Sequence, residues 1–342
     1  MHNKSLFIAT LLFTILLSSQ YVTTTSAITA NLILNLDTNK KIYGVGENIQ
    51  IYGSLFYEWE SPSLPRIPVE DVVTLQINYP STYGIHMLRT IATGSLEYKT
   101  WSVEILQLTP CDESGNPKQS FKRGTTAYFK VEFKNNDNVS RYVMIVFTLC
   151  YGNGRPFAAF SPTSGTLSPN ETRLGVFPVP ISSDATIGSA KIYTSALSDL
   201  LSDNGYPYCP EKTADFTITT TSSLAAYNEK QIANLLEAEV AGSYSLTFPT
   251  PIKITGNYTV YASSRLIGTR QATNTTTFEV KPLIGDVNLD GVVNMLDYQL
   301  VKIAIPSWPG DPKWNPNADM DGNLVINMLD FQIVKIHIGE HM

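Results

Sequence analysis

The chain has 342 residues, of which 16% are charged, and its formal net charge at pH 7 is −6. This length is sufficient for two or three domains. The negative charge and the lack of any basic run in the sequence exclude nucleic acid as an expected partner.

The N-terminal stretch MHNKSLFIATLLFTILLSSQYVTTTSA has the layout of a secretory signal peptide. Lys4 supplies a short positive region, an apolar run begins at Leu6, and a Ser/Thr-rich stretch ends at Ala27. We therefore expect residues 1–27 to be removed and the mature protein to be secreted and associated with the cell surface. An N-terminal membrane anchor is the alternative, although the apolar run is short for a span of about 20 residues. We expect no membrane span in the mature chain.

Residues 30–280 have the pattern of strands separated by turns. In TAYFKVEFK, the apolar residues Ala127, Phe129, Val131 and Phe133 occupy every second position, which is typical of a strand with one buried face. Several short strands spaced by Gly, Pro and Asn clusters indicate β-sandwiches. The predicted fold class is mainly β, with two immunoglobulin-like β-sandwiches and a small all-α module at the C-terminus.

The distribution of strands predicts a discontinuous first domain. Residues 99–223 hold about seven candidate strands, enough for one complete sandwich of about 100 residues. Residues 30–98 and 224–280 are each too small to cover an apolar face alone, but together they supply a second set of strands. We expect the 99–223 sandwich to be inserted into this domain, because the termini of a domain often lie close together. Three sequential domains are the alternative, and AAYNEKQIANLLEAEVAG is a predicted helical connector.

Two stretches of this region resemble known sandwich families. DTNKKIYGVGENIQIYG is similar to the entry strands of macroglobulin-type domains, and FKRGTTAYFKVEFKNND is similar to sandwich domains of exported archaeal proteins. Both resemblances imply a fold and nothing about activity.

The sequence also predicts covalent modifications of an exported protein. Its three cysteines, Cys111, Cys150 and Cys209, allow at most one disulfide and one unpaired thiol. We favour a bridge between Cys111 and Cys209, although spacing does not decide the pairing. N-glycosylation is predicted at the four sequons that follow the signal peptide, Asn138, Asn170, Asn257 and Asn274.

Two similar stretches end the chain, GDVNLDGVVNMLDYQLVKIAI and ADMDGNLVINMLDFQIVKIHI. In each, Asp and Asn alternate before a helical pattern begins. A calcium loop of about 12 residues gathers oxygen ligands from positions 1, 3, 5, 7 (a carbonyl), 9 and 12. The predicted ligands of loop 1 (286–297) are Asp286, Asn288, Asp290, Val292, Asn294 and Asp297. Those of loop 2 (319–330) are Asp319, Asp321, Asn323, Val325, Asn327 and Asp330.

The two loops keep a constant offset of 33 residues, from 286 to 319 and from 297 to 330. Each loop carries three carboxylates, so we expect two calcium ions. Loop 1 has Gly291 at position 6, where a sharp turn is needed, whereas loop 2 has Leu324. Because a branched residue is strained at positive φ, we expect the second site to be the weaker one.

The segments after the loops are predicted helices with matched apolar faces. Pro306 ends the first helix and Gly339 ends the second. Neither repeat is large enough to fold alone, so we expect the helices to pack together. The apolar residues assigned to the buried faces are Leu296, Leu300, Val301, Ile303 and Ile305, and Leu329, Ile333, Val334, Ile336 and Ile338.

These duplicated loop–helix units resemble the type I dockerin module, and the linker PSWPGDPKWNPNADMD resembles its archaeal form. The resemblance covers residues 283–340. It implies calcium binding and docking onto a cohesin domain of an extracellular scaffold, often one that gathers polysaccharide-degrading components. It also implies that loop positions 10 and 11 help to select the cohesin. The residues expected in partner binding are Met295, Leu296, Lys302, Met328, Leu329 and Lys335.

Loop positions 10 and 11 carry a polar pair in bacterial dockerins, but Met and Leu in this chain. Either part of each Met-Leu pair belongs to the core of the module, or the docking face is unusually apolar. The partner is then a cohesin-like domain or a sandwich of the same chain. The near-symmetry of the two repeats would permit two docking orientations.

No catalytic motif is present in the sequence, and after the signal peptide only His86, His337 and His341 remain. Paired carboxylates for glycoside hydrolysis stay possible on sequence grounds. We expect a non-catalytic adaptor. The alternatives are a carbohydrate-binding module, with Tyr57, Trp59 and Trp101 as candidate aromatic contacts, and a glycoside hydrolase component.

Overall fold

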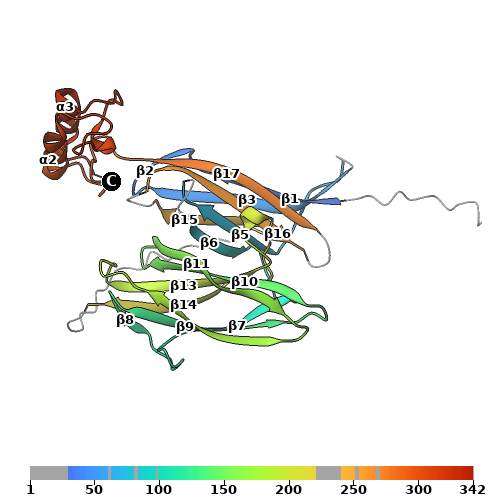
Figure 1. Ribbon diagram of the computed structural model, residues 1–342. Coiled ribbons are helices and arrows are strands. Elements are labelled where there is room, and N and C mark those ends of the chain that lie inside the picture. Colours follow the sequence, from blue (N-terminus) through green and yellow to red (C-terminus); the bar gives the residue numbers. More distant parts are fainter. Residues whose placement is uncertain are drawn as a thin grey trace, which may run out of the picture.

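The computed structural model describes residues 30–341, except 61–62, 81–83, 98, 221–239, 251–253 and 267–269. The predicted signal peptide and most of the predicted helical connector lie outside these residues. Two β-sandwiches and a helical module make up the described part of the chain, and the helices lie beyond one end of the first sandwich (Figure 1). None of the described helices is long and apolar enough to cross a bilayer.

The first sandwich consists of two sheets. One has the order β1 (Ala30–Thr38), β3 (Asn48–Trp59), β15 (Ser243–Pro249), with β4 (Ile67–Pro68) also pairing with β3. The other has the order β2 (Ile42–Gly44), β17 (Gln271–Lys281), β16 (Gly256–Arg265), β5 (Val72–Asn78), β6 (Ile85–Ala92). Each sheet therefore contains strands from before and after the second sandwich in the sequence.

Alternating side chains explain the core of this sandwich. Ile49 and Ile51 of β3 are fully buried, and β15 places Leu246 and Phe248 beside them in antiparallel register. On the facing sheet, the rings of Tyr258 and Phe278 stack with their centroids 5.1 Å apart. The Tyr258 hydroxyl donates a hydrogen bond of 2.7 Å to the Ile254 carbonyl, as in a tyrosine corner.

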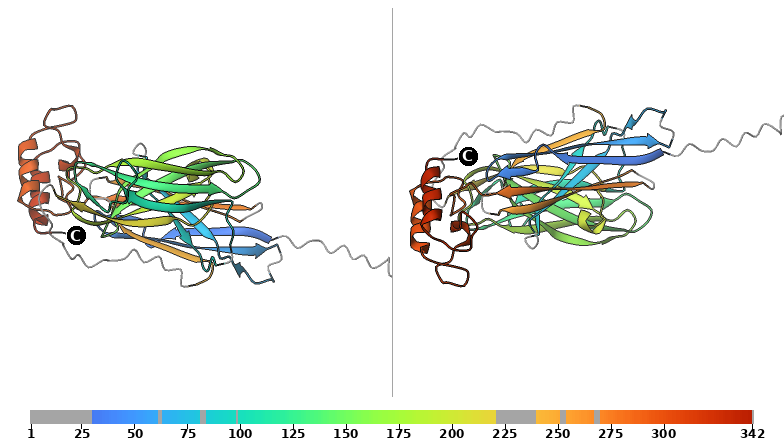
Figure 2. Two further views of the ribbon diagram at one scale, coloured as in Figure 1. Left: turned by 90° about the horizontal axis from the view of Figure 1, so that it is seen from below. Right: turned by 90° about the horizontal axis from the view of Figure 1, so that it is seen from above.

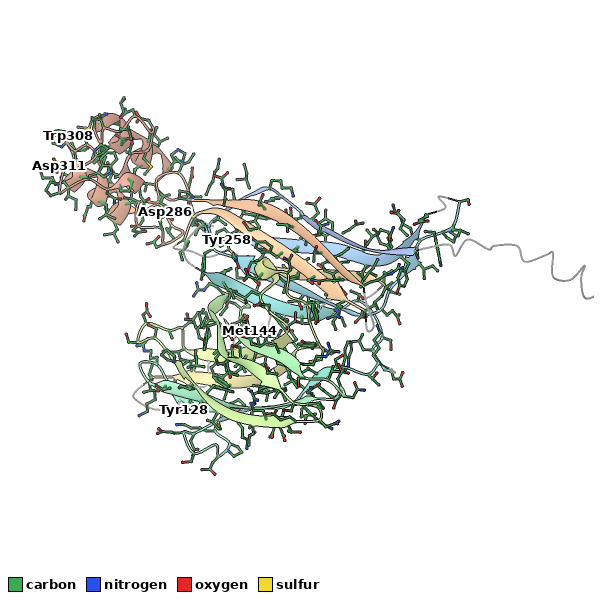
Figure 3. The ribbon with its side chains drawn as sticks, turned by 45° about the vertical axis from the view of Figure 1, so that its right-hand side comes forward. Tyr128, Met144, Tyr258, Asp286, Trp308 and Asp311 are labelled. Atoms are coloured by element: carbon green, nitrogen blue, oxygen red, sulfur yellow. The ribbon has the colours of Figure 1, made fainter. Side chains whose placement is uncertain are left out.

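The second sandwich also has two sheets. The larger has the order β11 (Pro156–Leu167), β10 (Arg141–Tyr151), β13 (Gly188–Leu197), β14 (Lys212–Thr219), β8 (Ser120–Lys122), and the short helix η1 (Leu201–Asp203) follows β13. The smaller has the order β12 (Thr172–Pro180), β9 (Thr126–Asn135), β7 (Val103–Cys111). In β9 the four apolar residues of the period-two pattern are buried, while Tyr128 is half-exposed on the outer sheet (Figure 3).

The two sandwiches pack against each other along β6, which lies at the junction in Figure 1, and they overlap in both views of Figure 2. Leu88 of β6 lies in an apolar cluster with Val146 and Leu197 of the second sandwich, and Met144, labelled in Figure 3, packs against this cluster. Beside the cluster, Arg89 and Glu211 form an ion pair of 2.7 Å, with side chains 0% and 6% exposed.

The prediction of a mainly β chain with two sandwiches and a small helical module is confirmed. The strand pairing of β15, β16 and β17 with β3, β5 and β2 supports an insertion of the second sandwich into the first. The exact boundaries at 98/99, 223/224 and 283 stay predictions.

The predicted disulfide between Cys111 and Cys209 is wrong, because both thiols are free and buried. Cys209 lies against the backbone of Ile105, whereas Cys111 ends the same strand six residues further on. At about 3.3 Å per residue the two cysteines are about 20 Å apart, and a disulfide requires Cα atoms within about 7 Å. Burial raises the pKa of Cys209 to about 12, so this thiol is unreactive.

The helical module contains α2 (Met295–Ala304), η2 (Pro316–Ala318) and α3 (Met328–His337). Val301 and Val334 at the centres of α2 and α3 are fully buried, and the rings of Tyr298 and Phe331 pack with centroids 4.0 Å apart. Its small core also includes Val293 and Ile326 from the loops before the helices.

Part of the predicted apolar face of each helix is not buried. Leu296 and Ile303 of α2 are 51% and 67% exposed, and Leu329 and Ile336 of α3 are 61% and 75% exposed. The buried stripe of α2 follows Asp297, Val301 and Ala304, at spacings of four and three residues. Leu296 and Ile303 fall outside that stripe, so their assignment to the core was wrong.

Candidate metal centre

The carboxylate at position 1 of each loop organises the turn that follows it. In loop 1, Asp286 accepts hydrogen bonds from the backbone N–H groups of Asp290 at 3.1 Å and Gly291 at 2.8 Å. Loop 2 repeats these contacts with Asp319 as acceptor and the N–H groups of Asn323 at 3.1 Å and Leu324 at 3.0 Å as donors. Each loop is therefore wrapped around its first predicted ligand.

The carboxylate at position 12 closes each loop from the helix side. Asp297 accepts the N–H groups of Val287 at 2.9 Å and Asn288 at 3.2 Å on Oδ1, and of Asn294 at 2.9 Å on Oδ2. The equivalent donors to Asp330 are Met320 at 2.7 Å, Asp321 at 3.3 Å and Asn327 at 2.8 Å. Both position-12 side chains are fully buried, so the helix start and the loop are fixed to each other.

The Asn at position 9 of each loop has a second role that the ligand pattern alone did not predict. The side chains of Asn294 and Asn327 each accept the N–H two residues further on, at 2.7 Å, and so cap α2 and α3. Together with the Asp three residues later they form capping boxes. The N-x-x-D spacing before each apolar run was the available sequence signal.

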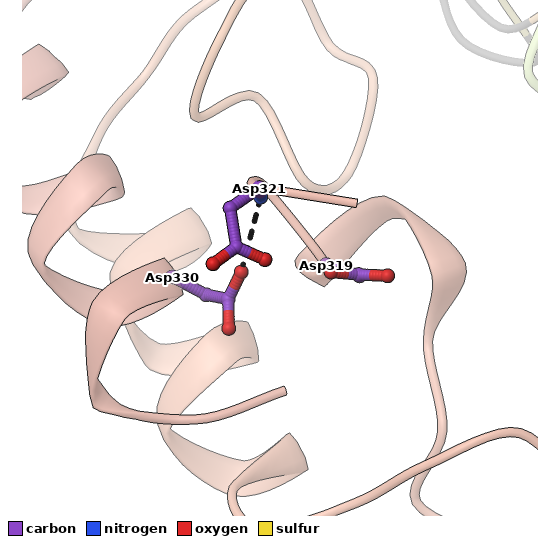
Figure 4. Close-up of side chains that lie close together, drawn as sticks. All are labelled: Asp319, Asp321 and Asp330. Carbon is purple, nitrogen blue, oxygen red and sulfur yellow. Dashed lines mark hydrogen bonds between the residues drawn. The ribbon is translucent and has the colours of Figure 1, made fainter. Parts of the chain in front are cut away.

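Carboxylates gather where a cation would bind. In loop 2, carboxylate oxygens of Asp319, Asp321 and Asp330 lie within 4.8 Å of one another (Figure 4). In loop 1, burial raises the pKa of Asp286, and the negative charges of Asp297 and Asp290 raise it further. A hard divalent cation would relieve this repulsion. Because the donors are carboxylate, amide and carbonyl oxygens, with no sulfur or imidazole, the set fits calcium.

The backbone conformation does not support the expectation that loop 2 is the weaker site because of strain at Leu324. Leu324 at position 6 of loop 2 does have a positive φ of 66°, but Leu289 at position 4 of loop 1 has φ 59°. The glycines occupy the complementary places, with Gly291 at position 6 of loop 1 and Gly322 at position 4 of loop 2. Each loop thus carries one leucine in the left-handed region, and backbone strain does not single out loop 2.

The repeat extends to the contacts that join the two halves of the module. Val293 in loop 1 exchanges backbone hydrogen bonds with the segment after α3, accepting from Gly339 and donating to Glu340, both at 2.8 Å. Ile326, the equivalent residue in loop 2, pairs with Ser307 after α2 at 2.9 and 3.4 Å. Glu340 and Ser307 are again 33 residues apart, so the module has internal two-fold pseudosymmetry.

The residues predicted to bind a partner lie on the surface of the module. Met295 and Leu296 are 56% and 51% exposed, and Met328 and Leu329 are 59% and 61% exposed. Lys302 and Lys335 are exposed as well. Asp286 lies on the side of the module from which β17 enters, and Trp308 and Asp311 lie on the opposite side (Figure 3).

The remaining predicted sites are scattered over the sandwiches. Asn138, Asn170 and Asn257 are exposed, whereas the Asn274 amide donates a hydrogen bond of 2.8 Å to the Leu34 carbonyl. Glycosylation stays a prediction at all four. Among the candidate aromatic contacts, Tyr57 packs on the core of the first sandwich and Trp101 on that of the second. Trp59, at the end of β3, is half-exposed.

Comparison with solved structures finds distant likenesses. The C-terminal domain of Wzt aligns over 38% of this chain and 87% of its own, with 10% identity and a TM-score of 0.31. A CARDB domain from Pyrococcus furiosus, solved with two metal ions, aligns over 37% and 96%, with 12% identity and a TM-score of 0.25. The alkylpurine DNA glycosylase AlkC of Pseudomonas fluorescens aligns over 36% of this chain, with 11% identity and a TM-score of 0.27. The alignment spans only 32% of the glycosylase.

These scores are too low to carry a functional inference. No curated protein matches the chain. A family model does match its C-terminal end: the dockerin type I domain aligns with residues 284–339, which include both loops and both helices. The repeated oxygen-rich loops, the capped helices and this match agree, and residues 284–339 are a type I dockerin domain.

Proposed function

We propose that the dockerin domain binds two calcium ions and thereby docks the chain onto a cohesin-type domain in an extracellular assembly, with the sandwiches serving as a non-catalytic spacer. The observation that carries the proposal is the repetition of the hydrogen-bond network of loop 1 in loop 2, contact by contact, at positions 1 and 12. A sequence of solvated acidic turns would not keep these contacts at a fixed offset.

The residues of each loop prepare it for a cation. Three carboxylates per loop supply enough negative charge to balance a divalent ion, and calcium would neutralise their mutual repulsion when bound. The backbone bonds to Asp297 and Asp330 orient these carboxylates before binding. Because the same two aspartates stand in the first turns of α2 and α3, occupancy of the loops and stability of the helices are coupled.

The exposed Met-Leu pairs support an apolar docking face. Met295 and Leu296 begin α2, and their counterparts Met328 and Leu329 begin α3. Ile303 and Ile336, the most exposed large apolar residues of the two helices, add to this surface. Exposed apolar groups of this extent on a small module mark an interaction site. Because of the pseudosymmetry, we expect either helix to occupy the same groove of the partner.

Calorimetric titration of the full chain with calcium tests the metal part of the proposal. We expect two ions per chain, and one ion in each of the matched variants Asp286→Ala and Asp319→Ala. Removing a position-1 carboxylate takes away a ligand and the acceptor of two backbone bonds. A chain that takes up no calcium would contradict metal binding by either loop.

Binding to purified type I cohesin domains, with calcium and with EDTA, tests docking separately. We expect capture in calcium and none in EDTA. Leu296→Asp and Leu329→Asp should each weaken capture by no more than a few-fold, because the other orientation remains, and the double variant should abolish it. Equal capture by the double variant and the parent chain would rule out this docking face. It would not contradict calcium binding by the two loops.

A further inference from the structure

A cavity of about 190 Å³ lies at the junction of the two sandwiches. The second sandwich supplies Trp101, Asp137, Arg141, Tyr206 and Tyr208, and the first sandwich supplies Arg265. Ligand sites occur preferentially at such domain interfaces, where aromatic walls and a few polar groups converge. None of the cavity residues belongs to loop 1 or loop 2 of the dockerin domain.

The aromatic walls are fixed in place. The rings of Tyr206 and Tyr208 meet edge to face with centroids 5.4 Å apart, and the Tyr208 hydroxyl donates a hydrogen bond of 2.9 Å to the Tyr142 carbonyl. The backbone around Tyr206 is held by two 3.0 Å hydrogen bonds with Ser198. Trp101 is half-exposed at the edge of the second core. Aromatic faces held in this way can stack on the apolar face of a sugar ring.

The charged groups at the cavity leave one net positive charge. Asp137 and Arg141 form an ion pair of 2.6 Å, so they neutralise each other. The guanidinium of Arg265 lies 4.0 Å from the centroid of the Tyr206 ring, and no acidic side chain pairs with it in the described part of the chain. A guanidinium presents a planar set of donors that matches a carboxylate.

The contacts between the sandwiches keep the two sides of the cavity together. The Gln271 amide of the first sandwich donates hydrogen bonds to the carbonyls of Asn204 at 3.1 Å and Gly205 at 3.2 Å, directly before Tyr206. The position of Arg265 relative to Tyr206 is thus set by hydrogen bonds on both sides of the junction, and the cavity is formed before any ligand arrives.

We propose that this cavity binds one ring of an acidic sugar, with its carboxylate on Arg265, its apolar face against Trp101 and the Tyr206 ring edge, and its hydroxyls on the Asp137–Arg141 pair. The volume supports a single ring, since pockets for larger ligands measure about 300–1,000 Å³. Arg265 would select the acidic sugar over its neutral counterpart. The proposal is independent of calcium and of the docking partner.

The test is a titration of the full chain with glucuronate, glucose and acetate in EDTA, followed by NMR of the tryptophan indole N–H signals. We expect glucuronate to shift the Trp101 signal, assigned with Trp101→Phe, and to bind at least tenfold more tightly than glucose or acetate. In Arg265→Gln the preference for glucuronate over glucose should disappear.

Arg66→Gln is the matched control, because Arg66 also lies over an aromatic ring, 4.6 Å from the centroid of Phe56, but outside the cavity. This variant should keep the parent preference. The proposal is overturned if glucuronate leaves the Trp101 signal unchanged, if Arg265→Gln keeps the preference, or if acetate binds as tightly as glucuronate. None of these results would bear on calcium binding by the dockerin domain.

Discussion

Four residues of loops 1 and 2 have a positive φ, and the energetic cost of that conformation differs between leucine and glycine. For Leu289 and Leu324 it costs about 1–2 kcal/mol each, whereas for Gly291 and Gly322 it is unstrained. A Cβ added at either glycine would meet no atom within 4 Å. Alanine substitutions at the two glycines therefore report on the backbone alone.

We predict that Leu289→Gly and Leu324→Gly each raise the free energy of unfolding of the dockerin domain by about 0.5–1 kcal/mol. The relief of strain exceeds the greater entropy of glycine in the unfolded chain. Gly291→Ala and Gly322→Ala should lower it by about 0.5–1 kcal/mol, because the lower entropy of the unfolded alanine chain offsets part of the strain. Urea titrations in EDTA, monitored through the indole signals of Trp308 and Trp314, measure both. A loss of stability in the Leu→Gly variants would show that the leucine side chains contribute more than the backbone does.

His86 is a buried base without a hydrogen-bond partner among the described residues. It is 2% exposed, neither ring nitrogen is bonded, and its ring lies among the rings of Tyr79, Tyr258 and Phe248. Burial lowers the pKa of His86 from 6.5 to about 3. The folded chain therefore holds a neutral imidazole across the range in which the unfolded chain takes up a proton.

The lowered pKa of His86 predicts a stability that is complete above pH 6.5 and falls as the pH drops from 6.5 towards 3. Between pH 7 and pH 5 the free energy of unfolding of the sandwiches should decrease by about 2 kcal/mol. His86→Phe should remove this pH dependence without lowering the free energy of unfolding at pH 7, because a phenyl ring has no unpaired polar atoms. The control variant His341→Gln should show the same pH dependence as the parent chain. Urea titrations at both pH values measure the difference, and an unchanged pH dependence in His86→Phe would assign it to another group.

At the scale of single elements, α2 and α3 each begin at an asparagine that is both a cap and a predicted calcium ligand. We predict that Asn294→Ala and Asn327→Ala each reduce the helicity of the domain in EDTA, at a cost of about 1 kcal/mol. Both should also weaken calcium binding at their own loop. Asn→Asp at either position should keep the helicity, since aspartate is an equally good cap. Circular dichroism and calorimetry separate the two roles, and a helix unaffected by Asn→Ala would mean that its cap contributes nothing.

The elements also show where sequence reasoning succeeds and where it fails. The period-two pattern of β9 predicted its buried face because every second residue is apolar. The spacing of Asp and Asn predicted two equivalent loops, and the carboxylates at positions 1 and 12 do organise each loop, while their role as metal ligands stays a prediction. The helix faces were assigned too broadly, since apolar residues such as Ile303 and Ile336 stand outside the narrow stripe that a two-helix module buries. The left-handed conformation of Leu289 depends on the closed loop. The cavity depends on residues 101, 206 and 265, which meet only in the folded chain.

At the scale of the whole molecule, the second sandwich covers an edge of the first. Strand β6 ends its sheet, so its outer backbone groups need partners. The Thr148 hydroxyl bonds with both the N–H and the carbonyl of Leu88, at 3.0 and 2.8 Å, and Glu211 accepts the Thr90 N–H at 2.8 Å. Side chains from one sandwich thus complete the edge of the other, so the two sandwiches share one hydrogen-bonded junction.

The buried ion pair at this junction gives the last prediction. Arg89 donates two hydrogen bonds to Glu211 Oε1, at 3.0 and 2.7 Å, and its guanidinium lies 3.4 Å from the centroid of the Tyr193 ring. Arg89→Met should lower the free energy of unfolding by about 3–5 kcal/mol, because it leaves Glu211 buried without a cation. The double variant Arg89→Met/Glu211→Gln should recover most of that loss.

The recovery is expected because the glutamine carbonyl still accepts the Thr90 N–H while no buried charge remains. Urea titrations of the single and double variants measure the free energies, and small-angle scattering of the full chain measures whether the sandwiches stay together. Equal losses in the two variants would show that the ion pair itself, with its contact to Tyr193, holds the junction. In either case the edge of β6 loses protection when the junction opens, so the rate of proteolysis between the sandwiches should increase about tenfold for each 1.4 kcal/mol lost.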